Sequence, residues 1–305
     1  MNNNDFYDVL IIGGSYSGLS AAMSLARSMR SVLVIDSGEP CNRQTPYTHN
    51  FLTQDGNSPD EIRTVAKSEL ELYEHMTFAN TKAEAANRIP NGFEVETANG
   101  VYYKGRKLLL ASGVRDILPK VEGIAECWGI SVLHCPYCHG YEVKNEKTIL
   151  IANGTAAFEA AKVISHWTKD LIILTNGKSK LKPDQLDLLE LRGIPVVESR
   201  VRSLVHQNGK VNTVLCTDGT SYDTTTVYAQ SKTEQHAPLA KELGCKFNRH
   251  GLIKVDVLQK TSEPGIYACG DNSSKGRSVA VAVAAGSVAG IFINKELVDE
   301  AFFAS

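Results

Sequence analysis

The stretch DVLIIGGSYSGLSAAMSLARSMRSVLVID, residues 8–36, constrains the fold more than any other part of the chain. A short apolar run leads through a glycine turn into residues at helical spacing, and a second apolar run, SVLVID, follows. Uninterrupted apolar runs of this length are typical of strands that are buried on both faces of a parallel sheet. The pattern therefore predicts a strand–helix–strand unit of the kind that binds dinucleotides.

The turn of this unit reads Gly13-Gly14-Ser15-Tyr16-Ser17-Gly18, so that Ser15 replaces the second glycine of the G-x-G-x-x-G fingerprint. Such a turn lets backbone N–H groups at a helix start approach a pyrophosphate. Asp36 ends the second strand, where an acid accepts ribose hydroxyls and disfavours a 2′-phosphate. The first site is thus expected to suit FAD or NAD better than NADP.

A similar layout recurs at residues 147–177, KTILIANGTAAFEAAKVISHWTKDLIILTNG. This weak repeat predicts a second dinucleotide-type domain. Its turn keeps Gly154 alone of the three glycines, and Ala152 and Asn153 would crowd a pyrophosphate. The loop that follows has lysines but no arginine cluster for a 2′-phosphate. NADPH or NADH binding in this domain is therefore doubtful.

Other stretches predict further elements. FEVETANGVYYKGRKLLLASG indicates a hairpin that turns at Asn99-Gly100 and runs into a buried strand, and GIYACGD indicates a short strand. GRSVAVAVAAGSVAGIFINKEL indicates a helix of small residues that must pack closely against another element.

Composition narrows the class of protein. The net charge of −2 provides no basic field for nucleic acid or an anionic membrane, and no run reaches the ~20 apolar residues of a spanning helix. No signal peptide is visible at the amino terminus. Seven cysteines, mostly isolated, fit buried thiols plus one special pair in a reducing compartment. We expect a soluble, cytoplasmic protein.

The special pair lies in HCPYCH, residues 134–139, which is compatible with a metal clip, a structural disulfide or a redox pair. A zinc site usually combines two separated ligand pairs, and the sequence has no second one, so we predict no metal. A structural disulfide is not expected in a cytosolic chain. Pro136 suits a first helical position, and His139 titrates near neutral pH, as an acid/base for thiol chemistry does.

The ordered motifs (the first glycine turn, LLLASG at 108–113, the CxxC and GIYACGD at 265–271) resemble those of low-molecular-weight thioredoxin reductases. The resemblance implies an α/β fold with two Rossmann-like dinucleotide-binding domains, each a three-layer ββα arrangement, the second inserted into the first. Residues 1–117 and 232–305 would form the FAD domain, and residues 118–231 an NAD(P)H-binding-like domain that carries the CxxC. A homodimer is also implied.

The resemblance also implies roles for residues. Cys138 would face the flavin, Cys135 would exchange with the substrate, and His139 would act as acid/base. From the sequence itself we expect Glu142 to be an exposed helical residue, with a partnership to His139 as the alternative. The implied FAD-binding residues are Gly13, Ser15, Tyr16, Ser17, Gly18, Asp36, Arg43, His49, Asn50, Ala111, Ser112, Gly113, Gly270, Asp271 and Val279.

Two departures from the family leave the electron partner open. His139 stands where an acid usually follows the second cysteine, and the second glycine turn is eroded. CPYCHGYE is similar to the subgroup of gliotoxin- and holomycin-type dithiol oxidases, which pass electrons to oxygen. Three hypotheses follow: an NADPH- or NADH-driven reductase of a thioredoxin-like protein; a dithiol oxidase or ferredoxin-linked reductase that needs no nicotinamide; and a flavin redox sensor without turnover. The expected substrate of an enzyme is a thioredoxin-like protein or a small dithiol or disulfide.

Overall fold

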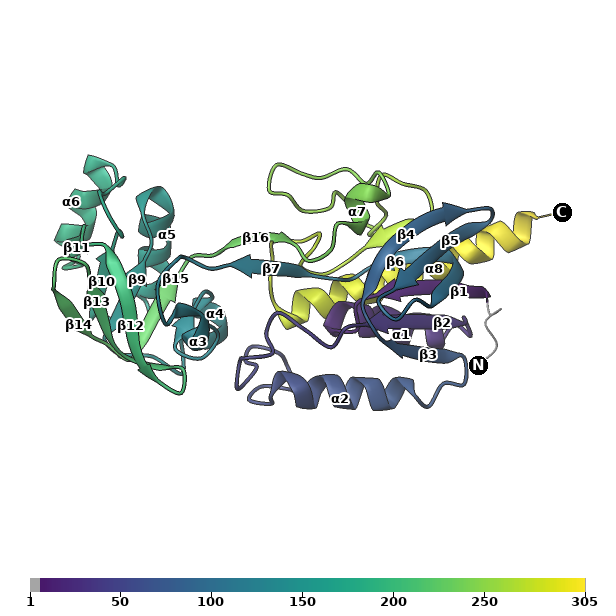
Figure 1. The fold of residues 1–305 in the computed structure, drawn as a ribbon, viewed down its shortest axis with the longest axis horizontal. Helices are drawn as coiled ribbons and strands as arrows, with labels where there is room; N and C mark the ends of the chain where they lie inside the picture. Colours follow the sequence, from purple (N-terminus) through teal and green to yellow (C-terminus); the bar gives the residue numbers. More distant parts are fainter. Residues whose placement is uncertain (1–5, 305) are drawn as a thin grey trace. The chain divides into compact units, whose positions relative to one another are not determined.

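The structure, a computed structural model that describes residues 6–304, divides into two compact units (Figure 1). The first comprises the described residues up to Arg43, Asp60–Arg115 and the residues from Thr233 onward. The second comprises Gln44–Pro59 and Asp116–Lys232. The two later crossings lie within two residues of the expected domain boundaries. Residues 44–59, which we expected in the first domain, group instead with the second unit.

The first unit contains a sheet of seven strands in the order β3-β2-β1-β6-β5-β4, with β17 also paired to β6. These strands are β1 (Phe6–Ile12), β2 (Val32–Asp36), β3 (Met76–Asn80), β4 (Ala83–Ile89), β5 (Gly92–Thr97), β6 (Tyr102–Leu110) and β17 (Ile266–Ala268). The pairs among β3, β2, β1, β6 and β17 are parallel, whereas β4, β5 and β6 are joined by antiparallel pairs. The predicted hairpin is therefore β5–β6, and the predicted strand in GIYACGD is β17.

Alternation along β1 explains how the sheet is covered on both faces. Val9 and Ile11 belong to a buried cluster with α1 (Tyr16–Ala26) and α8 (Val279–Phe303). Leu10 and Ile12 point the other way, into a cluster that includes Phe93 of β5 and residues of the short helix α7 (Leu239–Glu242). Because successive side chains of a strand point to opposite faces, one apolar run supplies two cores.

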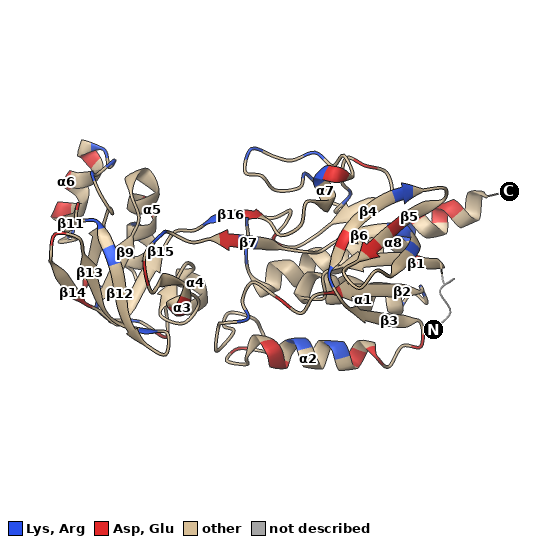
Figure 2. Cartoon of the chain, in the orientation of Figure 1, with Lys and Arg blue, Asp and Glu red and all other residues tan. Residues whose placement is uncertain are grey.

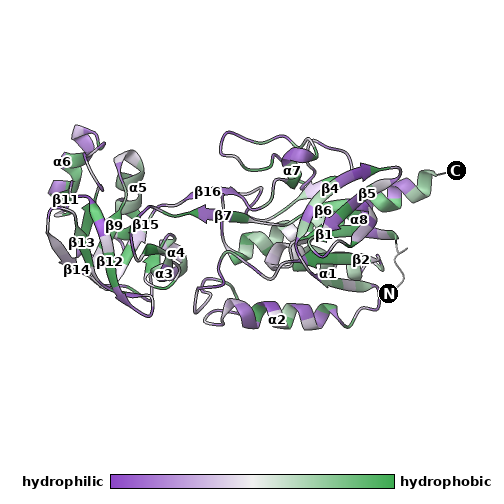
Figure 3. Cartoon of the chain, viewed as in Figure 1, coloured by the Kyte–Doolittle hydropathy of each residue, from purple (hydrophilic) through white to green (hydrophobic). Residues whose placement is uncertain are grey.

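The small residues of α8 let it lie directly on α1, as the sequence predicts. A Cβ on Gly286 would come within 2.1 Å of the Ser17 carbonyl oxygen, and one on Gly290 within 2.6 Å of the Ala21 carbonyl oxygen. Length and composition alone would let α8 cross a membrane. Its buried face packs on α1, however, and Glu296 and Glu300 in its last turns pair with lysine and arginine side chains, so it serves as a core helix of this unit (Figure 3).

The helix α2 (Pro59–Leu70) begins at the second crossing between the units, the first being that after Arg43, and carries charges of both signs (Figure 2). Asp60 and Glu61 lie in its first turn and Lys67 in its last. This order complements the helix dipole, which favours acids at the N-terminus and bases at the C-terminus. Strands β7 (Val114–Ile117) and β16 (Lys232–Gln235) pair where the chain passes between the units.

The second unit has three layers. Its central sheet is parallel, with the order β11-β10-β9-β15-β8, and a second sheet has the order β12-β13-β14. The strands are β8 (Val132–Leu133), β9 (Thr148–Ile151), β10 (Leu171–Leu174), β11 (Val196–Val197), β12 (Val201–Gln207), β13 (Lys210–Cys216), β14 (Ser221–Asp223) and β15 (Thr226–Ala229). The helices are α3 (Ile124–Cys127), α4 (Pro136–His139), α5 (Gly154–Ile164) and α6 (Pro183–Leu191).

The two cores of this unit define the layers. Ile149 and Val227 of the central sheet pack with Leu204 and Val214 of the antiparallel sheet, while Leu150 and Ile173 pack with the helices α5 and α6 on the opposite face. The antiparallel sheet, the central parallel sheet and the helices therefore stack in that order, which confirms the predicted ββα arrangement.

Candidate active site

The first glycine turn brings three elements of the first unit together. Gly13 follows β1 with φ of +109°, and a Cβ there would lie 2.3 Å from the Ala111 carbonyl oxygen at the end of β6. A Cβ on Gly18 would lie 1.9 Å from the Gly13 carbonyl oxygen. Glycine is therefore required at both positions for steric reasons, since any side chain would force the turn open.

A pocket opens over this turn. It is lined by six residues that the motifs place there, Gly13, Gly14, Ser15, Asp36, Ala111 and Ser112. Ser15 is the N-cap residue of α1, with an extended backbone and no side-chain cap hydrogen bond. A Cβ on Gly14 would meet Asp36 Cβ at 2.8 Å, so the bare backbone and the carboxylate lie side by side. The cradle of backbone, cap and acid fits the pyrophosphate and ribose of a dinucleotide such as FAD.

Sequence reasoning missed part of this pocket. Lys82 and Ala83 at the start of β4, and His236 and Ala237 after β16, also line it. These residues come from connections between elements and belong to no motif. For Lys82 and Ala83, a search of the segment that follows β3 at the carboxyl edge of the parallel sheet would have been the available signal.

Other predicted flavin residues are not among those that line the pocket. The Ser17 hydroxyl, on the buried face of α1, donates to the Cys269 carbonyl oxygen at 3.4 Å. The Tyr16 hydroxyl accepts from Asn42 Nδ2 at 3.3 Å, and Arg43 donates to the carbonyl of Pro40. Gly113 and Gly270 have φ values of +66° and +85°, in the left-handed region that favours glycine.

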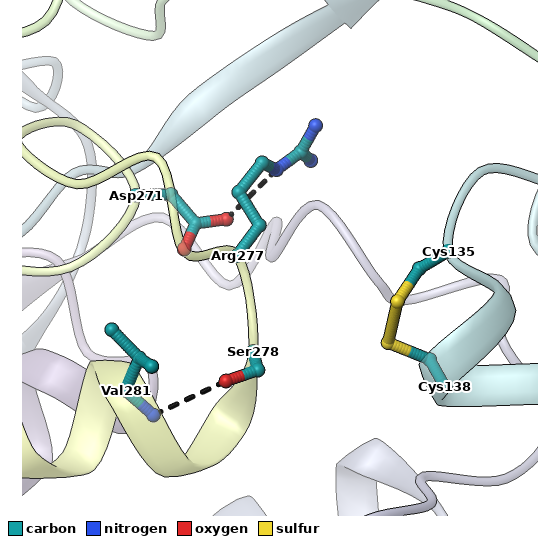
Figure 4. The surroundings of a disulfide bond; sticks show 6 residues. All are labelled: Cys135, Cys138, Asp271, Arg277, Ser278 and Val281. Carbon is teal, nitrogen blue, oxygen red and sulfur yellow. Dashed lines mark hydrogen bonds and ion pairs between the residues drawn. A yellow bond between two sulfur atoms is a disulfide. The ribbon is translucent and has the colours of Figure 1, made fainter. Parts of the chain in front are cut away.

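Asp271 has a partner that the sequence did not suggest. Arg277 Nε lies 3.1 Å from its Oδ2, and both side chains are about four-fifths buried (Figure 4). The next residue, Ser278, caps α8, which begins at Val279, because its hydroxyl accepts from the Val281 N–H at 3.2 Å (Figure 4). The cap leaves Asp271 and the first turn of α8 in a fixed local arrangement.

In the second unit, Cys135 and Cys138 form a disulfide, with Cα atoms 5.3 Å apart (Figure 4). Cys135 is the N-cap of the single turn α4, and Pro136 occupies the first helical position, as predicted. Gly140 ends the turn, and a Cβ there would lie 2.9 Å from the ring of Trp167. Trp167 also meets Tyr137 edge to face, with ring centroids 5.6 Å apart. The CxxC turn therefore packs against Trp167.

His139 directly follows the disulfide. Burial lowers the pKa of His139, nearby His49 lowers it further, and Glu142 opposes both. The imidazole is thus held in its neutral form around neutral pH, where one nitrogen accepts a proton. Glu142 lies in a turn rather than a helix, and its Oε1 is 3.6 Å from Nδ1 of His49. His49 and Asn50, predicted at the flavin, belong to the second unit, whereas Arg43 belongs to the first.

The second glycine turn is occupied by the side chain of Asn153. Its Oδ1 accepts from the N–H groups of Gly154 at 2.8 Å and Lys180 at 2.7 Å. Its Nδ2 donates to the carbonyls of Thr175 at 2.9 Å and Lys178 at 3.0 Å. This amide thereby ties the start of α5 to the loop after β10, and a group that competed for the Gly154 N–H would have to displace it.

The remaining cysteines differ in exposure. Cys127, Cys216, Cys245 and Cys269 are buried, as predicted, and burial raises the pKa of each thiol. Cys41 is exposed, contrary to its interpretation as a buried apolar residue. Within residues 6–304, no three His, Cys, Asp or Glu side chains gather as metal ligands would.

Comparison with known proteins places this geometry in a family. A family model described as pyridine nucleotide-disulphide oxidoreductase matches residues 7–286. The thioredoxin reductase tcpT of Claviceps purpurea is 30% identical, over 97% of this chain and 96% of its own. An oxidoreductase from Agrobacterium tumefaciens is 35% identical with a TM-score of 0.90, over 97% and 99% of the two chains. The structure of HlmI is 30% identical with a TM-score of 0.93, over 99% and 96%.

The matched family, the two dinucleotide-type units and the disulfide in a CxxC turn lead to one conclusion. This chain belongs to the pyridine nucleotide-disulphide oxidoreductase family and is a thioredoxin reductase-like disulfide oxidoreductase.

Proposed function

We propose that the protein moves two electrons between a substrate dithiol or disulfide and FAD through Cys135 and Cys138. The observation that carries the proposal is the Cys135–Cys138 disulfide, half-buried and followed at once by a histidine in its neutral form. A structural disulfide has no need of a proton acceptor beside it, whereas thiol–disulfide exchange does.

FAD, held by the glycine turn, Asp36 and the pocket residues of the first unit, would supply a two-electron acceptor and donor. We assign the adenosine ribose to Asp36 and the pyrophosphate to the bare backbone at Gly13 and Gly14. Asp271, oriented by Arg277, and the first turn of α8 at Val279 are proposed to hold the ribityl and flavin end.

The cysteines would act in sequence. For a substrate dithiol, one substrate thiolate attacks Cys135 Sγ and displaces the Cys138 thiolate, which gives a mixed disulfide. The second substrate thiolate then displaces Cys135, so that the substrate leaves as a disulfide and the enzyme holds two thiols. His139 takes up a proton released from a thiol in this exchange. On giving up two electrons, Cys135 and Cys138 would close to the disulfide again, and the reverse sequence would reduce a substrate disulfide.

The substrate and the electron partner are the finer parts of the proposal. The name of the Claviceps relative supports a thioredoxin-like protein as substrate, and a small dithiol or disulfide is the alternative. NADPH or NADH is the family's usual electron source. The engagement of the Asn153 amide at the second glycine turn favours a second candidate, an oxidase or ferredoxin-linked reductase that does not use nicotinamide. A homodimer and a cytoplasmic location stay predictions.

One anaerobic experiment tests both parts. The purified protein is mixed separately with NADPH, NADH and dithiothreitol, and the visible absorption band of the flavin is followed. If dithiothreitol bleaches the flavin of the wild type but not that of Cys135→Ser, the cysteine relay is supported. Equal bleaching in the two proteins refutes it. Bleaching by a nucleotide favours the reductase, whereas bleaching by the dithiol alone favours the second candidate.

A further inference from the structure

Residues 44–59 form a hydrogen-bonded loop that belongs to the second unit. The Thr48 N–H donates to the Asn57 carbonyl at 2.7 Å, and the Gly56 N–H donates to the Thr48 carbonyl at 2.9 Å. The Asn50 N–H donates to Asp55 Oδ1 at 2.7 Å. These bonds close the loop on itself, so the residue between Thr48 and Asn50 is presented in a defined direction. That residue is His49.

The buried Nδ1 of His49 faces two carboxylates. Its Nδ1 is removed from solvent and makes no hydrogen bond among the described residues, yet Glu142 Oε1 lies at 3.6 Å and Asp55 Oδ2 at 3.7 Å. A buried polar nitrogen without a partner is costly, and a carboxylate can only accept. An N–H at Nδ1 therefore has two carboxylate acceptors within a short approach of hydrogen-bonding distance.

The other neighbour of His49 is His139 itself. The two rings meet edge to face, with centroids 6.2 Å apart and an interplanar angle of 88°. Tyr47 of the same loop lies 6.5 Å from the His49 ring. Tyr228 of β15 is the further titratable group near Glu142, and burial followed by that carboxylate raises its pKa well above the ordinary range, so it stays neutral. The groups that set the charge around His139 are thus His49 and Glu142.

We propose that His49 is a positioning residue of the thiol site: held by Glu142 and Asp55, it fixes the ring of His139 beside Cys138 and makes loop 44–59 part of the redox machinery. This inference rests on the proposed function of His139. The role at the flavin that the resemblance implied for His49 stays a separate prediction.

The opposite electrostatic effects of the two neighbours give the proposal a sharp test. His49 lowers and Glu142 raises the pKa of His139. His49→Gln is therefore expected to move the acid limb of the pH–rate profile to higher pH, and Glu142→Gln to move it to lower pH. Two charges separated by the 6.2 Å between the rings alter an equilibrium by a factor of about three in a water-like dielectric, and by more in a part-buried site.

The assay is anaerobic flavin reduction by dithiothreitol on the flavoprotein, measured from about pH 4.6 to about pH 8.6, roughly one unit beyond the usual range of histidine pKa values at each end. In His49→Gln the rate at the acid end should fall about threefold more than the rate at the alkaline end. His75→Gln is the matched control, because His75 Nδ1 also lies 3.7 Å from a glutamate, Glu74, but in the first unit. The control should keep the wild-type profile.

A second readout does not depend on turnover. Titration of His139 by NMR, with histidine ring labels, should show shifts of opposite sign in His49→Gln and Glu142→Gln. A His139 titration that is unchanged in both variants overturns the proposal, and so do shifts of the same sign, which general loosening would produce. A third outcome separates the two claims. If the His139 shifts are seen but Cys135→Ser reacts with dithiothreitol as the wild type does, the contact between His49 and His139 is supported and the proposed function is refuted.

Discussion

Replacing Glu296 by Gln is expected to destabilise the first unit, because this carboxylate is the shared acceptor of three donors. Lys107 Nζ lies 2.6 Å from its Oε1, and Lys260 Nζ and the Tyr267 hydroxyl lie 2.5 Å and 2.7 Å from its Oε2. The side chain of Lys107 is 6% exposed and that of Glu296 21% exposed. Neutralising Glu296 thus weakens the pairing of a buried ammonium, which is far costlier than losing a surface ion pair.

The magnitude follows from the titration of this group. Burial by itself would raise the pKa of Glu296, but the hydrogen bonds from Lys107, Lys260 and Tyr267 together outweigh it and lower the pKa from 4.5 to about 2. That interval corresponds to about 3 kcal/mol of differential interaction, and partial exposure reduces the expected loss to about 2 kcal/mol. Because the folded pKa is depressed, the contribution is present above about pH 4.5 and is lost as the pH falls toward 2.

The assay is urea unfolding at pH 7 and again near pH 3, followed by circular dichroism and by tryptophan fluorescence. Trp128 and Trp167, the two tryptophans of the chain, both lie in the second unit, so Glu296→Gln should shift the dichroism transition more than the fluorescence transition. Asp299→Asn is the control, because Asp299 pairs with Lys295 on the exposed face of the same helix and should change stability by less than about 1 kcal/mol. Equal losses in the two variants, or an undiminished loss at pH 3, would refute the reasoning.

Three further substitutions test other parts of the structure. Gly18→Ala places a Cβ 1.9 Å from the Gly13 carbonyl oxygen, so the purified protein should retain much less flavin by absorbance; full retention would contradict the assignment of the turn. Asn153→Ala removes four hydrogen bonds and should lower the stability of the second unit by about 1–3 kcal/mol, read by tryptophan fluorescence, and a loss confined to the first unit would argue against that role. Cys138→Ser should abolish flavin bleaching by dithiothreitol while flavin stays bound, and bleaching at the wild-type rate would exclude the relay.

The sequence predicts those features that depend on local pattern. Alternation in β1 and the small residues of α8 specify a sheet covered on both faces and a close helix pair, and both are present. Pro136 at the first position of α4 follows from its missing N–H group. The sequence predicts that Asn153 obstructs the second glycine turn. In the structure its Oδ1 and its Nδ2 each form two hydrogen bonds.

Features that depend on contacts between distant segments escaped prediction. His49 and His139 are 90 residues apart, and no periodicity links a loop after the first strand pair to the CxxC turn. Lys82 and His236 reach the dinucleotide pocket from separate connections for the same reason. Arg277 is a charge within a loop, and only the fold shows that it faces Asp271. Loop residues carry the site, and loops have the weakest sequence signals.

The packing of α8 on α1 has a consequence for how the protein forms in the cell. Helix α1 and strand β6 are made before the second unit, whereas their partners β17 and α8 are made after it. The greater part of the second unit, Asp116–Lys232, is complete before either partner exists. Domains fold as units during synthesis, so the inserted unit is able to form on the ribosome while the unit that surrounds it waits for α8 and β17 to be made. Until then the early half presents an uncovered apolar sheet face, and it is at this stage that we expect the nascent chain to depend on chaperones.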